Sequence, residues 1–75
     1  MSEIHIVGWR PGLEKIGMTR LLREQAGLRL KEAKDCTDRV LEGETIVLPM
    51  SDASQAEKLA NELNHIGAIV ELRKQ

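Results

Sequence analysis

The sequence predicts an α+β fold: a two-layer sandwich, in the order β-α-α-β-α-β, with three helices on one face of a three-stranded sheet. Apolar residues alternate in three short segments and recur at helical spacing in three longer ones. Single glycines and prolines separate these segments, as turns and helix ends require. Three short helices are too few to cover both faces of a sheet, so we expect them on one face.

The chain begins with a strand followed by a helix. Alternation over residues 4–9 predicts the strand, and Arg10-Pro11-Gly12 forms the turn that closes it. Helical spacing predicts the first helix over residues 13–26, with its apolar stripe centred near Met18 and Leu22. We therefore expect Leu22 in the core.

Gly27 joins the first helix to a second one with almost no loop between them. Glycine can end a helix in the left-handed conformation, with a positive φ, which other residues adopt reluctantly. The second helix is predicted over residues 30–41, and the two helices form a hairpin whose exposed faces share one surface. The residues expected on its buried side are Leu30, Ala33, Thr37 and Val40, with Cys36 as a further candidate.

The second half of the chain continues with a strand, a helix and a strand. A turn at residues 42–44 leads into a strand over residues 45–48, which the following proline ends. Ser51 or Asp52 caps the third helix, a glycine ends it, and residues 68–73 form the last strand. The core face of the third helix is predicted to consist of Ala56, Leu59, Ala60 and Leu63.

The composition is that of one small globular domain over residues 1–75. The residues are 41% hydrophobic and 31% charged, and no apolar segment is long enough to cross a membrane. The N-terminus lacks the basic start and the cleavage site of a signal peptide. The single cysteine, Cys36, cannot form an internal disulfide. We expect a cytoplasmic protein.

No catalytic or metal-binding pattern is present in the sequence. His5 and His65 lie far from each other and from Cys36, so the spacing of a metal site is missing. Cys36 is expected in the middle of a helix, where no helix N-terminus lowers the pKa of its thiol, which favours an inert role. The glycines are scattered singly, which excludes a phosphate loop. We predict no enzyme, no metal and no cofactor.

The charges are divided unevenly along the chain. Residues 1–34 hold seven basic and four acidic residues, whereas the remainder holds four basic and eight acidic residues. Such a division predicts one basic and one acidic surface. Nucleic acid is disfavoured as a partner because Trp9 is the only aromatic residue, too few for base stacking.

The exposed side of the helical hairpin carries an apolar residue among cations. At about 100° per residue, Ile16 falls opposite the apolar stripe, on the side of Arg20 and Arg23. Lys31 and Lys34 are neighbours on the outer surface of the second helix. One interpretation is a solvated face, with each lysine paired to the aspartate four residues later. The other is a docking site for an acidic protein partner.

The segment KIGMTRLLREQAGLRLKEAKD resembles the C-terminal domain of the bacterial ribosomal large-subunit stalk protein, known as L-seven/L-twelve. The family pattern is K-V-x-V-I-K-x-V-R-x-x-T-G-L-G-L-K-E-A-K-x-L-V, and its ending A-G-A-x-V-E-L/V-K is similar to IGAIVELRK here. The resemblance implies a non-enzymatic domain with the same order of elements. In the family, this domain recruits translational GTPase factors through the exposed face of its first two helices.

The resemblance also implies which positions contact the partner. They are Lys15, Ile16, Met18, Arg20, Arg23 and Lys34, to which the helical-face argument adds Lys31. Met18 aligns with an exposed valine of the family, although its spacing places it near the core.

Several departures from the family pattern leave room for a different partner. Thr19 stands where the family has isoleucine, Arg29 replaces a glycine, and RVLEGETIVLPMSD is longer and more apolar than its counterpart. The sequence holds neither the dimerisation region nor the hinge of the stalk protein, so we expect an excised domain or a free-standing relative. The alternatives are a ClpS-like adaptor for proteolysis, with the same order of elements, and an RNA-contacting accessory protein.

Overall fold

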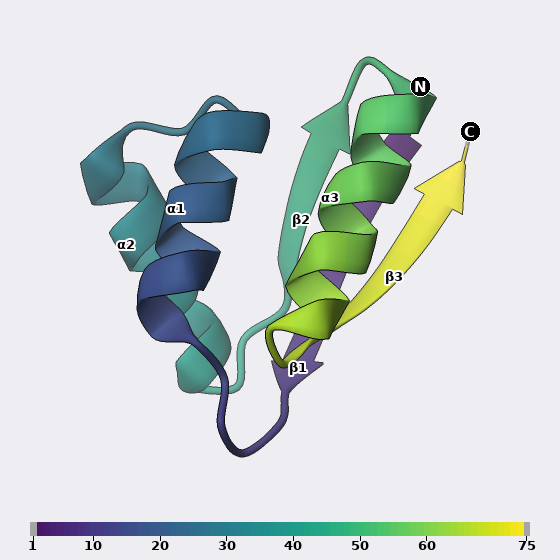
Figure 1. The fold of residues 1–75 in the computed structure, drawn as a ribbon. Helices are drawn as coiled ribbons and strands as arrows, with labels where there is room; N and C mark the ends of the chain where they lie inside the picture. Colours follow the sequence, from purple (N-terminus) through teal and green to yellow (C-terminus); the bar gives the residue numbers. More distant parts are fainter. Residues whose placement is uncertain (1, 75) are drawn as a thin grey trace.

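The computed structural model describes residues 2–74, which form six elements in the predicted order (Figure 1). The strands are β1 (Ser2–Trp9), β2 (Ile46–Met50) and β3 (Ala68–Lys74), and the helices are α1 (Lys15–Gln25), α2 (Leu30–Leu41) and α3 (Ala53–His65). The α+β fold class and the order β-α-α-β-α-β are therefore confirmed. None of the helices in this range is long and apolar enough to cross a membrane.

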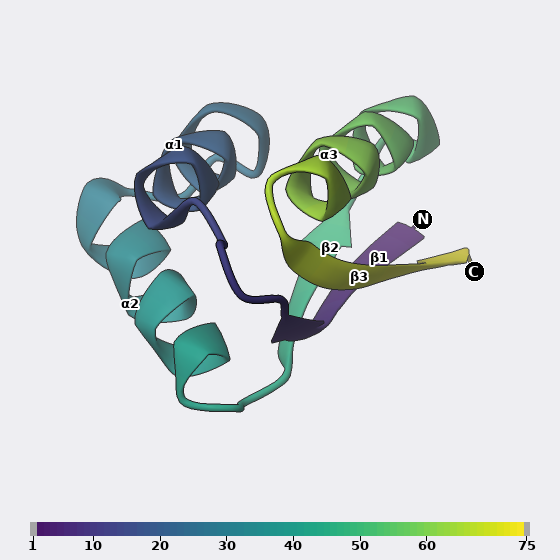
Figure 2. The same ribbon diagram turned by 60° about the horizontal axis from the view of Figure 1, so that its bottom comes forward.

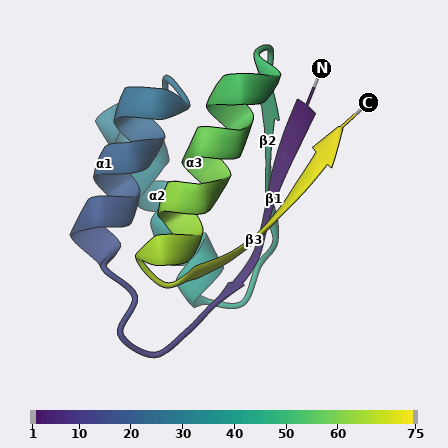
Figure 3. The ribbon, with the colours of Figure 1, turned by 45° about the vertical axis from the view of Figure 1, so that its right-hand side comes forward.

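β1 is the central strand of an antiparallel sheet with the strand order β2-β1-β3. Its predicted alternation holds, because Ile4 and Ile6 are fully buried while His5 between them lies on the opposite face. The helices gather on the inner face of the sheet, with α2 and α3 against the strands and α1 packed on both helices (Figures 2 and 3). One face of the sheet thus supports the whole helical layer.

α1 and α2 run in opposite directions and are joined by a short turn. The backbone N–H of Leu28 donates to the carbonyl of Leu22 at 3.3 Å and closes the end of α1. Gly27 has a φ of 72° in this turn, which confirms its predicted positive φ. α2 begins at once, because the Arg29 N–H donates to the Glu32 carboxylate at 3.1 Å and caps the new helix. The two helices therefore form the predicted hairpin.

α1 starts two residues later than the sequence predicts. The backbone N–H of Glu14 donates to the carbonyl of Ile66 at 3.1 Å, and the N–H of Arg10 donates to that of Gly67 at 2.8 Å. These bonds hold the loop between β1 and α1 against the junction of α3 and β3. Glu14 is extended, with φ −82° and ψ 92°, so Leu13 is a buried loop residue and not the first helical residue.

β2 also differs from its predicted bounds. It begins one residue later and continues through Pro49 to Met50, so the proline does not end the strand. β2 is an edge strand, bonded only to β1, and a proline on the open edge removes no hydrogen bond from the ladder. The cap of α3 is settled as Asp52, whose Oδ1 accepts the N–H of Ser54 at 2.8 Å.

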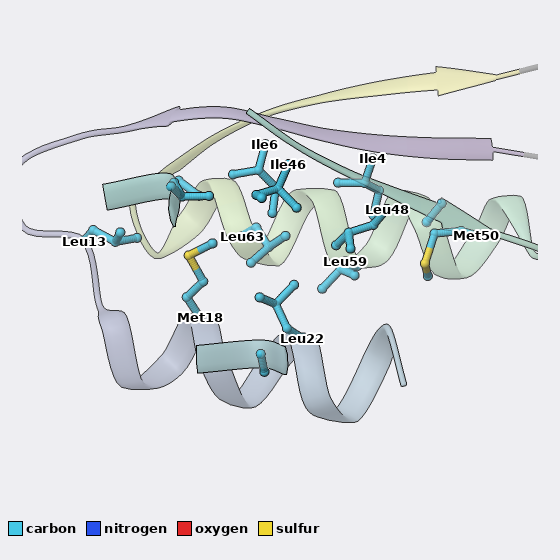
Figure 4. Packing of buried hydrophobic residues seen from close by; sticks show 14 residues of the cluster. Ile4, Ile6, Leu13, Met18, Leu22, Ile46, Leu48, Met50, Leu59 and Leu63 are labelled. Carbon is cyan, nitrogen blue, oxygen red and sulfur yellow. The ribbon is translucent and has the colours of Figure 1, made fainter. Parts of the chain in front are cut away.

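A single aliphatic core fills the space between sheet and helices (Figure 4). Met18 and Leu22 point from α1 towards Leu59 and Leu63 of α3, and all four side chains are fully buried. The predicted burial of Leu22 and Leu59 is confirmed. The other core residues are Ile4, Ile6, Leu13, Ala33, Val40, Ile46, Leu48, Met50, Ala56 and Ala68.

Truncating a fully buried leucine of α3 should threaten a domain of this size. We predict that Leu59→Ala lowers the free energy of unfolding by about 2–5 kcal/mol, because it removes a fully buried side chain and leaves a cavity. Urea denaturation followed by circular dichroism measures this change. A loss below about 0.5 kcal/mol would contradict the packing described here.

Two glycines with positive φ offer a matched comparison. At Gly67, with a φ of 113°, an added Cβ would lie 2.9 Å from the backbone Cα of Leu13, whereas at Gly27 it would meet no atom within 4 Å. Gly27→Ala should therefore cost only the backbone strain, about 1–2 kcal/mol. Gly67→Ala should cost clearly more, because the loop before α1 must also move. Thermal denaturation of the two variants side by side tests this order, and equal losses would refute it.

Candidate functional site

A groove of about 540 Å³ runs along the outer side of the hairpin, between α1 and α2. Apolar, hydroxyl and cationic side chains line it together. The lining residues are Lys15, Ile16, Thr19, Arg20, Arg23, Leu30, Lys34, Thr37 and Asp38. Of the positions singled out in the sequence, the structure brings Lys15, Ile16, Arg20, Arg23 and Lys34 to this groove.

Ile16 is the most exposed large apolar side chain in the described part of the chain. Its side chain is 87% exposed, as the sequence predicted. The cause is the rotation of α1, because Met18 and Leu22 point into the core and residue 16 then faces outward. Ile16 thus provides an apolar surface at one end of the groove.

Leu30 was predicted to be buried, and this prediction is wrong. It is 45% exposed and lines the groove. It lies on the same side of α2 as the buried residues Ala33, Thr37 and Val40, but it is the first residue of the helix, where the rest of the fold covers only part of it. Helical periodicity identifies the side of a helix but not how far the covering element extends. The groove therefore has a second apolar end.

Met18 requires a correction to the contact positions that the family resemblance implied. Its side chain is fully buried beneath α1, so it does not lie on the surface of the hairpin. The helical spacing had placed it near the core, and that interpretation holds. Lys31 is exposed on α2 but is not among the residues that line the groove.

The cations of the groove have few partners within the chain. Arg20 lies 3.8 Å from Glu24, but both side chains are largely exposed, so the pair is weak. In the described part of the chain, no ion pair involves Lys15, Arg23 or Lys34. The lysine–aspartate pairs of the first interpretation are not among the ion pairs of the described residues, and Asp35 instead lies 3.9 Å from Arg39. The interpretation of these lysines as members of helix-surface ion pairs is therefore not supported.

Two threonines connect the helices at the floor of the groove. The Oγ1 atoms of Thr19 on α1 and Thr37 on α2 are 3.0 Å apart. The Thr37 hydroxyl also lies 3.0 Å from the carbonyl of Ala33, and the Thr19 hydroxyl lies 3.1 Å from the carbonyl of Lys15. Because each hydroxyl has one proton, the two threonines can make two of these three hydrogen bonds at a time. The sequence placed Thr37 on a buried face, but nothing in the spacing indicated that it would meet Thr19.

A second groove, of about 580 Å³, lies on the other side of α1, between α1 and α3. Three carboxylates line it, those of Glu14, Glu24 and Glu62, together with the half-buried Gln25. The Gln25 Nε2 donates to the Glu62 carboxylate. α1 therefore separates a groove lined by four cations from one lined by three carboxylates, with Arg20 lining both. Two of these carboxylates, Glu14 and Glu24, belong to residues 1–34, so the two grooves do not follow the division of charge along the sequence.

No cluster of side chains with the composition of a catalytic site stands out in residues 2–74. His5 Nε2 lies 3.2 Å from the Glu3 carboxylate on the open face of the sheet. No group of three or more histidine, cysteine or acidic side chains in the described chain could hold a metal ion. Burial raises the pKa of the half-buried Cys36 thiol, and the neighbouring carboxylate of Asp35 raises it further.

The raised pKa of Cys36 predicts a slow thiol. Because the thiolate is the reacting species, less of it is present at neutral pH than in a free cysteine, so alkylation by iodoacetamide should be slower than for a cysteine in a peptide. The rate should rise with pH and reach its plateau above the pH at which the free thiol does. Mass spectrometry over a pH series measures it, and faster alkylation than in the peptide would contradict this account.

Comparison with known proteins identifies a single family over most of the chain. Residues 6–73 match the model of the ribosomal protein L7/L12 C-terminal domain. The large ribosomal subunit protein bL12 of Xanthomonas euvesicatoria pv. vesicatoria is 35% identical over 72 residues, and that of Chlorobium phaeobacteroides is 39% identical over the same length. The bL12 protein of Thermosipho melanesiensis is 34% identical.

These matches cover 96% of this chain but only 55–56% of the relatives. The chain thus spans about half the length of the curated relatives it matches.

Proposed function

Because the chain belongs to the family of ribosomal protein L7/L12 C-terminal domains, we propose that its α1/α2 groove docks an acidic partner protein, namely a translational GTPase factor. The family is non-enzymatic, which agrees with a binding role. One observation carries the proposal: two exposed apolar side chains, Ile16 and Leu30, lie at the ends of a groove whose cations form one weak ion pair, Arg20 with Glu24, among residues 2–74.

The two kinds of side chain would contribute differently to binding. Apolar residues that become buried at the centre of an interface slow dissociation. Cations at the rim attract an acidic partner from a distance and raise the association rate, chiefly at low salt. Lys15, Arg20, Arg23 and Lys34 line the groove, and Lys31 adds charge beside it. The groove is thus suited to rapid, salt-sensitive association with an acidic surface.

The family supports the choice of partner. The hairpin sequence KIGMTRLLREQAGLRLKEAKD resembles the part that the family uses to recruit translational GTPase factors. The relatives are named as large ribosomal subunit proteins, which favours a role in translation over the ClpS-like alternative. Since the chain spans about half of their length, the proposal concerns this domain and its contact with the factor.

Binding kinetics should separate the two contributions. We predict that Arg23→Glu slows association of a purified bacterial elongation GTPase with the immobilised chain at low salt and reduces its salt dependence, because one cation of the rim is reversed. Ile16→Ala should instead speed dissociation severalfold, because it removes an apolar anchor. Surface plasmon resonance across a salt series measures both rates.

Two exposed positions outside the groove provide controls. Lys58→Glu reverses a cation on α3, and Val47→Ala shortens an apolar side chain on the sheet that is 46% exposed. Neither control should alter the rates. If the controls weaken binding while the groove variants do not, the docking site lies elsewhere on the domain, and failure of the elongation GTPases to bind would reject the proposed partner.

A further inference from the structure

The centre of the α1/α2 groove is polar, although both of its ends are apolar. Thr19 is half-buried there and Thr37 beneath it is only 3% exposed. Their hydroxyl oxygens, 3.0 Å apart, form the one side-chain hydrogen bond described between α1 and α2 in residues 2–74. The family pattern has isoleucine at the position of Thr19, so this hydroxyl pair distinguishes the present chain.

The two hydroxyl protons can be arranged in more than one way. In one arrangement, the Thr37 hydroxyl donates to the carbonyl of Ala33 and the Thr19 hydroxyl donates to Thr37. In the other arrangement, the Thr37 hydroxyl donates to Thr19, and Thr19 is free to donate to the carbonyl of Lys15 or towards the groove. Both carbonyls also accept a backbone N–H within their own helices. Thr19 can therefore turn its proton to a ligand in the groove while Thr37 satisfies its oxygen, and no buried group loses its only partner.

The charges around the threonines determine which ligand suits them. Lys15, Arg20 and Lys34 line the groove with Thr19, and Asp38 is the only acidic side chain among the lining residues. This excess of positive charge favours an arriving carboxylate, which accepts the Thr19 proton, over an amide or a cation. An apolar side chain at the same place would leave the Thr19 proton on its acceptors within the chain, so it would gain no hydrogen bond, whereas a carboxylate gains a charge-assisted one.

Helix geometry gives the spacing between the polar centre and the apolar ends. Ile16 precedes Thr19 by one turn of α1, and Leu30 precedes Thr37 by two turns of α2. Because the helices run in opposite directions, the two apolar residues lie on opposite sides of the threonine pair, about 15 Å apart along the groove. The groove thus presents the order apolar, hydroxyl and cation, apolar.

We infer that Thr19 determines the specificity of this groove: its hydroxyl selects a partner that places a carboxylate at the groove centre, between two apolar side chains. The inference rests on the proposed function only for the position of the docking surface. It adds the chemistry of one partner side chain and the residue that recognises it.

Two synthetic helical peptides test the inference without any GTPase. Both carry leucines about three turns apart and a glutamate one turn from the second leucine. The two peptides differ at a single position, one turn from the first leucine, which is glutamate in one peptide and leucine in the other. Nuclear magnetic resonance titration of the isotope-labelled chain gives the two dissociation constants. The wild-type chain should prefer the peptide with the extra glutamate about tenfold or more.

Variants at Thr19 decide whether the hydroxyl is responsible. Thr19→Val keeps the shape of the side chain and removes the hydroxyl, so only a small preference due to charge should be left. Thr19→Ser keeps the hydroxyl and should retain the full preference. Unchanged melting temperatures would show that both variants fold. An equal preference in wild type and Thr19→Val, or no binding of either peptide to wild type, would overturn the inference. If the peptides discriminate but no elongation GTPase binds, only the proposed partner fails.

Discussion

The burial of Met18 and Leu22 fixes the rotation of α1, and the surface of the hairpin depends on it. Both side chains are fully enclosed against Leu59 and Leu63 of α3. Any rotation of α1 that exposed them would lose on the order of 2–3 kcal/mol of apolar burial for each side chain. When these two side chains point inward, helical periodicity places Ile16, Arg20 and Arg23 on the outer side of α1. The core therefore determines which residues form the groove.

The second determinant is how closely α2 follows α1. Gly27 allows the chain to reverse within a short turn, and in the resulting register Thr19 lies opposite Thr37, with their hydroxyl oxygens 3.0 Å apart. This register places Leu30 at the far end of the groove and Lys34 between the apolar ends. Because few of the cations are paired within the chain, their charge is available to a partner.

The order of elements could be predicted because local signals agreed with the final fold. Helical and alternating periods, the glycines that end helices and the cap of α3 each act over a few residues. The errors arose where a distant segment decides the outcome. Leu30 has the period of a core residue but is only partly covered by the rest of the fold. Pro49 continues a strand because that strand is an edge, and Leu13 is held in a loop by the α3–β3 junction.

The candidate site was only partly predictable for the same reason. The exposure of Ile16 follows from the period of α1 alone, whereas the contact of Thr19 with Thr37 depends on how two helices pack. Aligning Met18 with an exposed valine of the family placed a core side chain at the surface. On a helix, residues two positions apart point to nearly opposite sides, so the residue two positions from an exposed one can be buried.

Nuclear magnetic resonance mapping shows directly whether the α1/α2 groove is the docking surface. The isotope-labelled chain is titrated with a purified elongation GTPase, and the backbone signals that shift or broaden first are assigned to residues. If the GTPase docks in the groove, these signals come from the residues around Ile16, Arg20, Arg23 and Lys34. Early changes confined to the open face of the sheet, around the exposed Val47 and Ile69, would contradict it.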